Sequence, residues 1–425
     1  MSSLRLFRIC TTGPYADLFF RFADSLVDSS FEDSMQACRE NGFLYPGGLR
    51  AALEAEGAEV MEILVDVPDL QKKWLREADE EPSRHEISET LFKQIGTFRP
   101  DVVYFQTFLA VPHHVRRQIR QRCPTVRRIV GHRGFPIMDC SGYEDVDAVF
   151  LGYPEYHDRW HAVGVQTFFH LHSFDEQLLP RILERNELRH DLAFAGTTGW
   201  GFDPHDGRYY DLRKMLDRTD LRVWGNEPAP RPPVYLGARE RVLAALVRLP
   251  EGVLRAIQVI GDRTHPFIAR VGRAALHRRH EAPARAAVTK PWYEHEPTIR
   301  QLYPDRIHPA LFGLDYLRLL ASTRVTWNRH LEMDGAGANM RVFEACGVGT
   351  CMLTDHRPEV VELFEPDREI VTYKTIEECI DKARYLLEHE SERKTIARAG
   401  QSRALRDHST ARRARELHAH LLGLL

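Results

Sequence analysis

Short apolar runs alternate with longer amphipathic stretches along almost the whole chain of 425 residues. Most of these runs are continuously apolar, which is typical of strands in a parallel sheet that is covered on both faces. The stretches between them have the length and spacing of helices, so the pattern predicts repeated βα units. The predicted strands are residues 4–9, 60–65, 102–105, 128–130, 148–151, 167–171, 192–195, 221–224, 325–327, 351–353 and 370–372. They are too many for one doubly wound sheet, and we therefore expect an α/β protein with two parallel sheets.

The domain boundary is predicted in a polar, helix-like segment, residues 173–189, that precedes a new series of strands. We expect a Rossmann-like N-terminal domain over residues 1–178 and a Rossmann-like C-terminal domain over residues 179–405. Residues 406–425 predict a final helix. The length of the chain also favours two to three domains.

One segment of the second domain departs from this rhythm. A proline cluster at residues 228–233 is followed by an amphipathic helical pattern, and we expect a helical insertion over residues 228–300. Residues 231–290 contain 12 Lys or Arg against four Asp or Glu, so the insertion is basic. Two interpretations stay open: a solvated helical hairpin, or a docking surface for an acidic acceptor, a protein partner or an anionic membrane face.

The composition is that of an ordinary soluble globular protein, with 43% hydrophobic and 28% charged residues. A net charge of −3 gives no electrostatic footprint for nucleic acid. The seven cysteines include no C-x-x-C pair, which argues against a zinc or redox motif and fits a reducing cytosol. The N-terminal apolar run is too short for a signal peptide, and no run approaches the roughly 18 residues of a membrane span. We therefore predict a cytoplasmic protein.

Residues 338–350 carry the most informative pattern in the chain. The polar residues Asn339 and Arg341 stand just before an apolar helical turn that contains a single carboxylate, Glu344, and an apolar strand follows. A helix that points at a strand end with a carboxylate in its first turns is a common way to bind a ribose diol. Its N-terminus suits a diphosphate, because free backbone N–H groups and the helix dipole both favour negative charge. The pattern predicts a nucleotide-sugar site.

The same stretch resembles the bacterial group-1 glycosyltransferases of the GT-B superfamily, and in particular their spore-maturation-type branch. The resemblance is specific over residues 305–420 and weaker in the first half of the chain. It is carried by residues 312–317, 323–330, 338–350, 362–365, 370–373 and 396–401, and in the first half by residues 70–74, 98–104 and 173–175. It implies a GT-B fold, in which two Rossmann-like domains face a cleft and the final helix packs back on the first domain.

The resemblance assigns Glu344 to the ribose hydroxyls, because it matches the last glutamate of the family motif. A solvated helix carboxylate is the alternative. Group-1 enzymes usually carry another glutamate eight residues earlier, where this chain has Ala336, so Asn339 or Asp334 could take over its contacts with the donor sugar. The nucleobase is expected near His308, where backbone amides could bind it, and the sequence does not identify the base.

Two other strand ends are predicted to contact the donor, since open parallel sheets bind ligands beyond the carboxyl ends of their strands. The first is followed by glycines and threonines, which allow a phosphate to approach the backbone closely; a plain βα turn is the alternative. The second is followed by an arginine, whose forked donors suit phosphate; a surface salt bridge is the alternative. The predicted donor-binding residues are Gly196, Thr197, Thr198, Asn328, Arg329, His330, Asn339, Arg341 and Glu344.

In the first domain, His132 stands at a strand end between two glycines and is the candidate catalytic residue. An unperturbed pKa near 6.5 suits proton handling, and the resemblance places a histidine of this domain near the donor sugar. A structural role is the alternative. No Asp-x-Asp pair follows an apolar strand, so neither a metal nor another cofactor is predicted. Arginines, helix N-termini and hydroxyls would then stabilise the departing nucleotide.

These features predict a glycosyltransferase that moves a sugar from a nucleotide-sugar donor to an acceptor hydroxyl held by the first domain. The acceptor, whether a small molecule, a polysaccharide or a protein, is not identified. Hexosyl transfer and retention of anomeric configuration are expected from the resemblance alone. Two alternatives stay open: a nucleotide-sugar epimerase or phosphorylase on the same fold, and a catalytically silent scaffold.

Overall fold

The computed structural model describes most of the chain from residue 3 to residue 425. The residues outside it are 14–25, 27, 82–86, 135–139, 141, 153–156, 185–186, 201–205, 226, 228–295 except Val253 and Ala256, and 332–336. The predicted insertion, residues 228–300, therefore lies almost entirely outside the described residues, as do Asp334 and Ala336. No helix in the described part is long and apolar enough to cross a bilayer.

The first sheet has six parallel strands in the order β2-β1-β3-β4-β5-β6. Its strands are β1 Arg5–Cys10, β2 Glu59–Leu64, β3 Val102–Phe105, β4 Arg128–Arg133, β5 Ala148–Leu151 and β6 Gln166–Phe169. Its helices are α2 Phe31–Glu40, α3 Leu49–Ala55, α4 Pro68–Glu77, α5 Ile87–Phe98, α6 His113–Arg116, α7 Ile119–Arg122 and α8 His157–His161. The strand order reverses between β1 and β3, which is where such sheets bind ligands.

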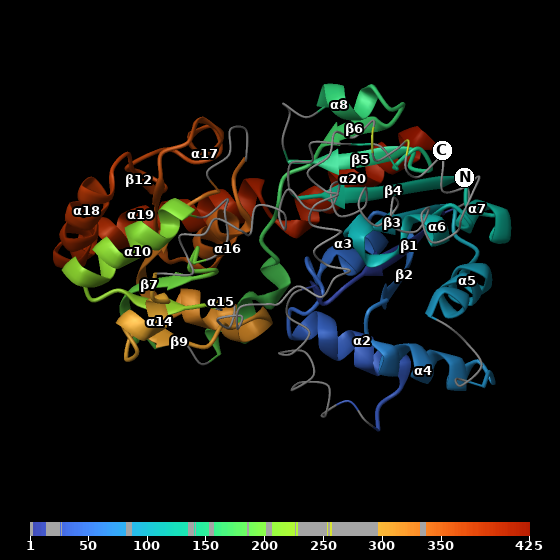
Figure 1. Ribbon diagram of the computed structural model, residues 1–425, viewed down its shortest axis with the longest axis horizontal. Helices are drawn as coiled ribbons and strands as arrows, with labels where there is room; N and C mark the ends of the chain where they lie inside the picture. The colour runs from blue at the N-terminus through green and yellow to red at the C-terminus, as the bar shows by residue number, and fades with distance from the viewer. Residues whose placement is uncertain are drawn as a thin grey trace.

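The second sheet also has six parallel strands, in the order β12-β11-β10-β7-β8-β9, and lies beside the first in Figure 1. Its strands are β7 His190–Ala195, β8 Arg222–Trp224, β9 Ile307–His308, β10 Thr323–Asn328, β11 Cys351–Asp355 and β12 Val371–Tyr373. The helices are α9 Leu179–Leu183, α10 Asp206–Arg218, α14 Ile299–Leu302, α15 Gly313–Ala321, α16 Met340–Val348, α17 Pro358–Val361, α18 Ile376–Glu388, α19 Glu390–Asp407 and α20 Thr410–Leu424. The order reverses between β7 and β10.

Both sheets bury apolar side chains on both faces, which explains the continuous apolar runs in the sequence. One face of the first sheet packs on α2, α4, α5 and α7, and the other on α3 and α20. The second sheet packs on α10, α14 and α18 on one face and on α9, α15 and α16 on the other. The predicted fold, two parallel sheets in two Rossmann-like domains, is confirmed.

The sequence analysis missed β9. This strand pairs only Ile307 and His308 with β8, so a pattern that needs four or more apolar residues cannot show it. The backbone pairing at the sheet edge, where Val223 N donates to the Arg306 carbonyl, holds it in place.

The chain passes between the two domains twice, and the two crossing segments pair with each other. Phe174 forms a parallel bridge with Ser409: its N–H donates to the His408 carbonyl, and the Thr410 N–H donates to the Phe174 carbonyl, both at 2.9 Å. The carboxylate of Glu176 accepts from the N–H groups of Thr410 and Ala411 and so caps α20. After this corner α20 runs along the first sheet, so the C-terminus lies beside the first domain (Figure 1).

A second contact between the domains forms where α2 ends. The Leu314 N–H at the start of α15 donates to the Asn41 carbonyl at 2.9 Å. Gly42 and Gly313 meet there, and a Cβ on Gly313 would collide with that carbonyl. The first domain therefore caps a helix of the second domain, and it can do so because two glycines let the backbones approach.

Gly347 fixes the position of the crossing relative to α16. The Phe174 ring, which is fully buried, lies so close to Gly347 that a Cβ there would overlap it. We predict that Gly347→Ala lowers the free energy of unfolding by about 1–3 kcal/mol, because overpacking a filled core forces side chains off their rotamers. Thermal and denaturant unfolding would measure it.

The matched control is Gly96→Ala, since Gly96 lies inside α5 with open space around it. There the added methyl should stabilise the helix by up to about 1 kcal/mol, because glycine loses more backbone entropy on folding. Equal melting temperatures for the two variants would contradict the proposed packing.

Candidate functional site

The carboxyl ends of β7, β10 and β11 gather polar side chains around one buried amide, that of Asn328. Its Oδ1 accepts from Arg341 Nη1 at 2.6 Å and from Asn339 Nδ2 at 3.1 Å. Its Nδ2 donates to Thr354 Oγ1 at 2.9 Å. Asn328 is fully buried, so in this structure it orients Arg341 and Asn339 at the start of α16.

Arg341 lies against the loop that follows β7. Its guanidinium carbon is 4.8 Å from the centre of the Phe194 ring, and its Nε is buried without a partner among the described residues. Gly196, at φ +153°, leaves the room for it, because a Cβ at Gly196 would collide with Arg341 Nη2. The glycine predicted to let a phosphate approach thus also admits the arginine.

Arg208, in the first turn of α10, approaches the same ring from another direction. Its guanidinium carbon is 5.5 Å from the Phe194 ring centre, and it donates to the Thr197 carbonyl, to Thr197 Oγ1 and to the Arg329 carbonyl. Burial, and next the nearby charge of Arg341, lower the pKa of Arg208 to about 9. The side chain is therefore still charged at neutral pH, in a place where another cation repels it.

Neither arginine forms an ion pair with a carboxylate among the described residues, although the charge of Asp355 acts on Arg208 and that of Glu344 on Arg341 from a greater distance. The N-terminus of α16 adds to this field: Asn339 is its N-cap but makes no side-chain capping bond. The first amides of a helix have no partner within the helix, and they attract anions. An anion with several oxygens is the ligand that this arrangement favours.

Arg329 and His330, also predicted to bind the donor, are each held by a carboxylate. Arg329 Nε donates to Asp211 Oδ2 at 2.6 Å, and the His330 backbone N–H and Nδ1 both lie within 2.9 Å of Asp355 Oδ1. The ring of His330 is buried, and its Nε2 has no hydrogen-bond partner among the described residues. Burial acts to raise the pKa of Asp355, but the adjacent His330 and the hydrogen bonds that the carboxyl accepts hold that pKa well below its usual range.

Glu344 lies one turn further along α16 and faces α15. Its Oε2 accepts from the Tyr316 hydroxyl at 2.8 Å. Burial raises the pKa of Glu344, although the Tyr316 hydrogen bond and Arg341 act in the opposite direction. The side chain is 8% exposed, so a solvated surface carboxylate, the alternative interpretation, does not describe it.

Thr197 and Thr198, in the loop after β7, differ in their environment. Thr197 accepts from Arg208 through both its carbonyl and its hydroxyl. Thr198 is 1% exposed, and its hydroxyl is buried without a partner among the described residues. A hydroxyl can donate as well as accept, so the Thr198 hydroxyl could donate a hydrogen bond to an oxygen atom of a ligand that approaches this loop.

His132 is in the other domain, at the carboxyl end of β4. Its ring centre is 5.4 Å from that of His172 and 6.2 Å from that of His170, and His172 in turn lies 6.4 Å from Phe343 on α16. Burial, followed by the charges of His172 and His170, lowers the pKa of His132 well below its usual value. His132 is therefore neutral at physiological pH and can accept a proton or donate a neutral hydrogen bond.

Comparison with known proteins identifies the fold of this chain. Residues 239–419 match the family described as "Glycosyl transferase-like". The structure resembles sucrose-phosphate synthase from Thermosynechococcus elongatus, at 11% identity and a TM-score of 0.52 over 99% of this chain and 100% of that one. It also resembles a glycosyltransferase from Rickettsia africae, at 11% identity and a TM-score of 0.51 over 99% of each chain. No curated protein matches the sequence.

This chain has the GT-B fold. Within it, the structure brings together Gly196, Thr197, Asn328, Asn339 and Arg341, which were predicted from three separate segments. Glu344 stands beside this group on the same helix, and His132 stands across the domain contact. These assignments to a donor stay predictions.

The sequence analysis missed Arg208 and Tyr316 in this GT-B chain. Arg208 follows the glycine loop by nine residues, inside a polar stretch with no distinctive pattern. Tyr316 lies in an amphipathic helix, where an aromatic residue suggests only a core position. Arginines are too common in this sequence for residue type alone to select Arg208.

Proposed function

We propose that this protein transfers a sugar from a nucleotide-sugar donor to an acceptor hydroxyl. The observation that carries the proposal is a pair of arginines, Arg208 and Arg341, at the carboxyl edge of the second sheet beside the N-terminus of α16, with no ion-paired carboxylate among the described residues. The match to a glycosyl transferase-like family and the GT-B fold support it. In this proposal Glu344 accepts hydrogen bonds from the ribose, and the diphosphate lies between the arginines and α16.

Sugar transfer leaves a nucleoside diphosphate with added negative charge on its terminal oxygen. Fixed cations and N–H groups aimed at that oxygen stabilise the transition state more than the ground state, which is the largest catalytic contribution that such a site can make. Arg208, Arg341 and the amides of α16 would supply this charge without a metal ion. His330, which Asp355 orients, could add a hydrogen bond through Nε2.

The first domain would hold the acceptor, so that domain closure brings its hydroxyl to the anomeric carbon and excludes water. His132 enters the proposal as a neutral group that accepts a proton or a hydrogen bond beside the reacting sugar. We further propose that the transferred sugar is a hexose and that its anomeric configuration is retained. The acceptor would be a small molecule, a polysaccharide or a protein, and the protein would act in the cytoplasm. All seven cysteines are buried free thiols, which suits a reducing compartment.

The function is tested by incubating the protein with a panel of nucleotide-sugars, each with and without EDTA. We expect slow hydrolysis of one donor to free nucleotide, at the same rate in EDTA, because arginines supply the charge that a metal would supply. Sugar interconversion without nucleotide release would instead identify an epimerase, and no binding of any donor would favour a scaffold. Activity that is lost in EDTA and restored by Mg²⁺ or Mn²⁺ would contradict metal independence.

The role of Glu344 is tested by Glu344→Ala with two ligands, the nucleoside diphosphate of the active donor and its 2′,3′-dideoxy analogue. The variant should weaken binding of the first by about 1–3 kcal/mol, since bonds to a charged carboxylate are lost, and leave binding of the second unchanged. Calorimetric titration gives both affinities. Asp315→Ala is the control, because it removes an exposed carboxylate next to Tyr316. Equal losses for both ligands would mean that Glu344 does not contact the ribose.

The role of His132 is tested by turnover rather than by binding. His132→Ala should lower kcat by roughly 10²-fold or more, as for a positioned proton-transfer group, while nucleotide affinity stays unchanged. Because burial lowers the pKa of His132, the imidazole stays neutral as the pH falls through 6.5, and wild-type kcat should stay level there. Steady-state donor hydrolysis from pH 5.5 to 8 measures both. His114→Ala, at an exposed histidine of the same domain, should behave like wild type. Unchanged kcat in His132→Ala would leave this histidine with a structural role.

A further inference from the structure

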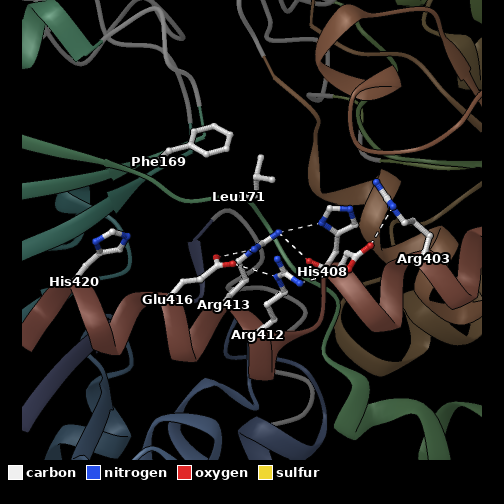
Figure 2. A pocket seen from close by; sticks show the side chains of 9 residues that line it. Phe169, Leu171, Arg403, His408, Arg412, Arg413, Glu416 and His420 are labelled. Carbon is white, nitrogen blue, oxygen red and sulfur yellow. Dashed lines mark hydrogen bonds and ion pairs between the residues drawn. The ribbon is translucent and has the colours of Figure 1, made fainter.

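A hollow of about 470 Å³ lies where the two crossings between the domains meet. Phe169, the last residue of β6, and Leu171, two residues further on, form one wall, and the corner between α19 and α20 forms the floor (Figure 2). We call this space the hinge hollow. Three arginines line its floor: Arg403, Arg412 and Arg413.

The carboxylates of the hinge hollow are shared among more arginines than they can neutralise. Asp407 lies 3.2 Å from Arg403, 3.4 Å from Arg412 and 2.8 Å from Arg406. Glu416 forms ion pairs with both Arg412, at 3.2 Å, and Arg413, at 2.6 Å. Glu369 reaches Arg403 only at 3.8 Å. Arg406 and Glu369 do not line the hollow; among the residues that do, three arginines face two carboxylates, so the floor keeps an excess of positive charge.

Two of these arginines are open to a ligand, and one is not. The side chains of Arg403 and Arg412 are 32% and 49% exposed, so an incoming anion can reach their guanidinium groups. Arg413 is buried, and its Nη2 contacts His408 Nδ1 at 3.0 Å. Burial, followed by the charge of Arg413, lowers the pKa of His408 to about 4. The imidazole is thus neutral, while Arg413 contributes a fixed charge below the open pair.

The wall opposite the arginines is apolar. Phe169 is 47% exposed, although it is a large hydrophobic residue at the end of a strand. Its ring stands above the floor in Figure 2, with Leu171 beside it and His420 at the far end. A ligand that fits this space has an anionic end for the arginines and an apolar part for Phe169.

We propose that the hinge hollow is a binding site for a phosphomonoester. Forked guanidinium donors match the oxygens of phosphate, and a dianion meets a floor with excess positive charge better than a monoanion does. The phosphate would bridge Arg403 on α19 and Arg412 on α20, and the organic part would cover Phe169. Because these helices meet at the crossing between the domains, the bound ester would tie that corner together. The proposal does not depend on the proposed transferase activity, since binding is measured without turnover.

The experiment is calorimetric titration of the full-length protein with phenyl phosphate. The variant Arg403→Ala/Arg412→Ala should bind it at least tenfold more weakly, because charge-assisted bonds to both arginines are lost. Arg398→Ala/Arg415→Ala removes one exposed arginine from each of the same helices outside the hollow and should bind like wild type. Phe169→Ala should weaken binding of phenyl phosphate but not of inorganic phosphate. Circular dichroism melting of each variant checks that it is folded.

The donor site also attracts phosphate, so Arg341→Ala is titrated in parallel. In this variant any phenyl phosphate binding at the donor site should weaken, whereas the binding that Arg403→Ala/Arg412→Ala removes should persist. Loss of binding in Arg341→Ala but not in Arg403→Ala/Arg412→Ala would overturn the proposal, and so would equal affinity in the hollow variant and wild type, or no binding by wild type.

A phosphomonoester could come from solution or from a lipid headgroup, and vesicles distinguish the two sources. Sedimentation with phosphatidylcholine vesicles that contain phosphatidic acid, dependent on Arg403 and Arg412, would identify the headgroup. Binding of phenyl phosphate without such sedimentation would identify a soluble ester. Sedimentation that persists in Arg403→Ala/Arg412→Ala would place membrane contact elsewhere on the chain and give the hollow no lipid ligand.

Discussion

The proposed donor site depends on one buried amide. Asn328 accepts from Arg341 and Asn339, and it donates to Thr354, so that a single side chain ties the ends of β10 and β11 to the start of α16. The amide lies out of water, where its hydrogen bonds are electrostatically strong and an unpaired partner would be costly. This arrangement holds Arg341 close to Arg208 in spite of their repulsion. Their charges are then in place before any ligand arrives, which lowers the cost of binding or stabilising an anion.

The helix that carries part of the proposed donor site, α16, is packed against the crossing between the domains. Gly347 on α16 admits the Phe174 ring from the crossing, and the first domain caps α15, whose Tyr316 bonds Glu344. A change in the relative position of the domains must therefore act on the surroundings of Glu344 through packed backbone and not through long, flexible side chains. In the proposed function, domain movement and donor binding would therefore be physically coupled.

The sheets could be predicted from the sequence because their strands are buried on both faces, and continuous apolar runs record that burial. The start of α16 was equally visible, since Asn339, Arg341 and Glu344 are polar residues in an apolar context. Arg208 and β9 were not. Arg208 matters because the fold places it beside Arg341 and Phe194, and a sequence does not show such a contact between distant segments. β9 forms by backbone pairing with the edge of β8. Its two residues are too few to show the apolar pattern of a strand in the sequence.

Burial leaves arginine side chains charged but leaves histidine side chains neutral, and both kinds of buried side chain are found in this molecule. An arginine stays charged when it is buried, because its intrinsic pKa is far above neutrality; even Arg208, at about 9, keeps its proton. A histidine in similar surroundings gives its proton up: burial lowers the pKa of His170 to about 3 and that of His172 to about 4. Fixed positive charge is therefore found where arginines line a strand edge or the hinge hollow. His170 and His172 lie next to His132, and their rings are neutral at physiological pH. They therefore add no positive charge that would repel the guanidinium of Arg413.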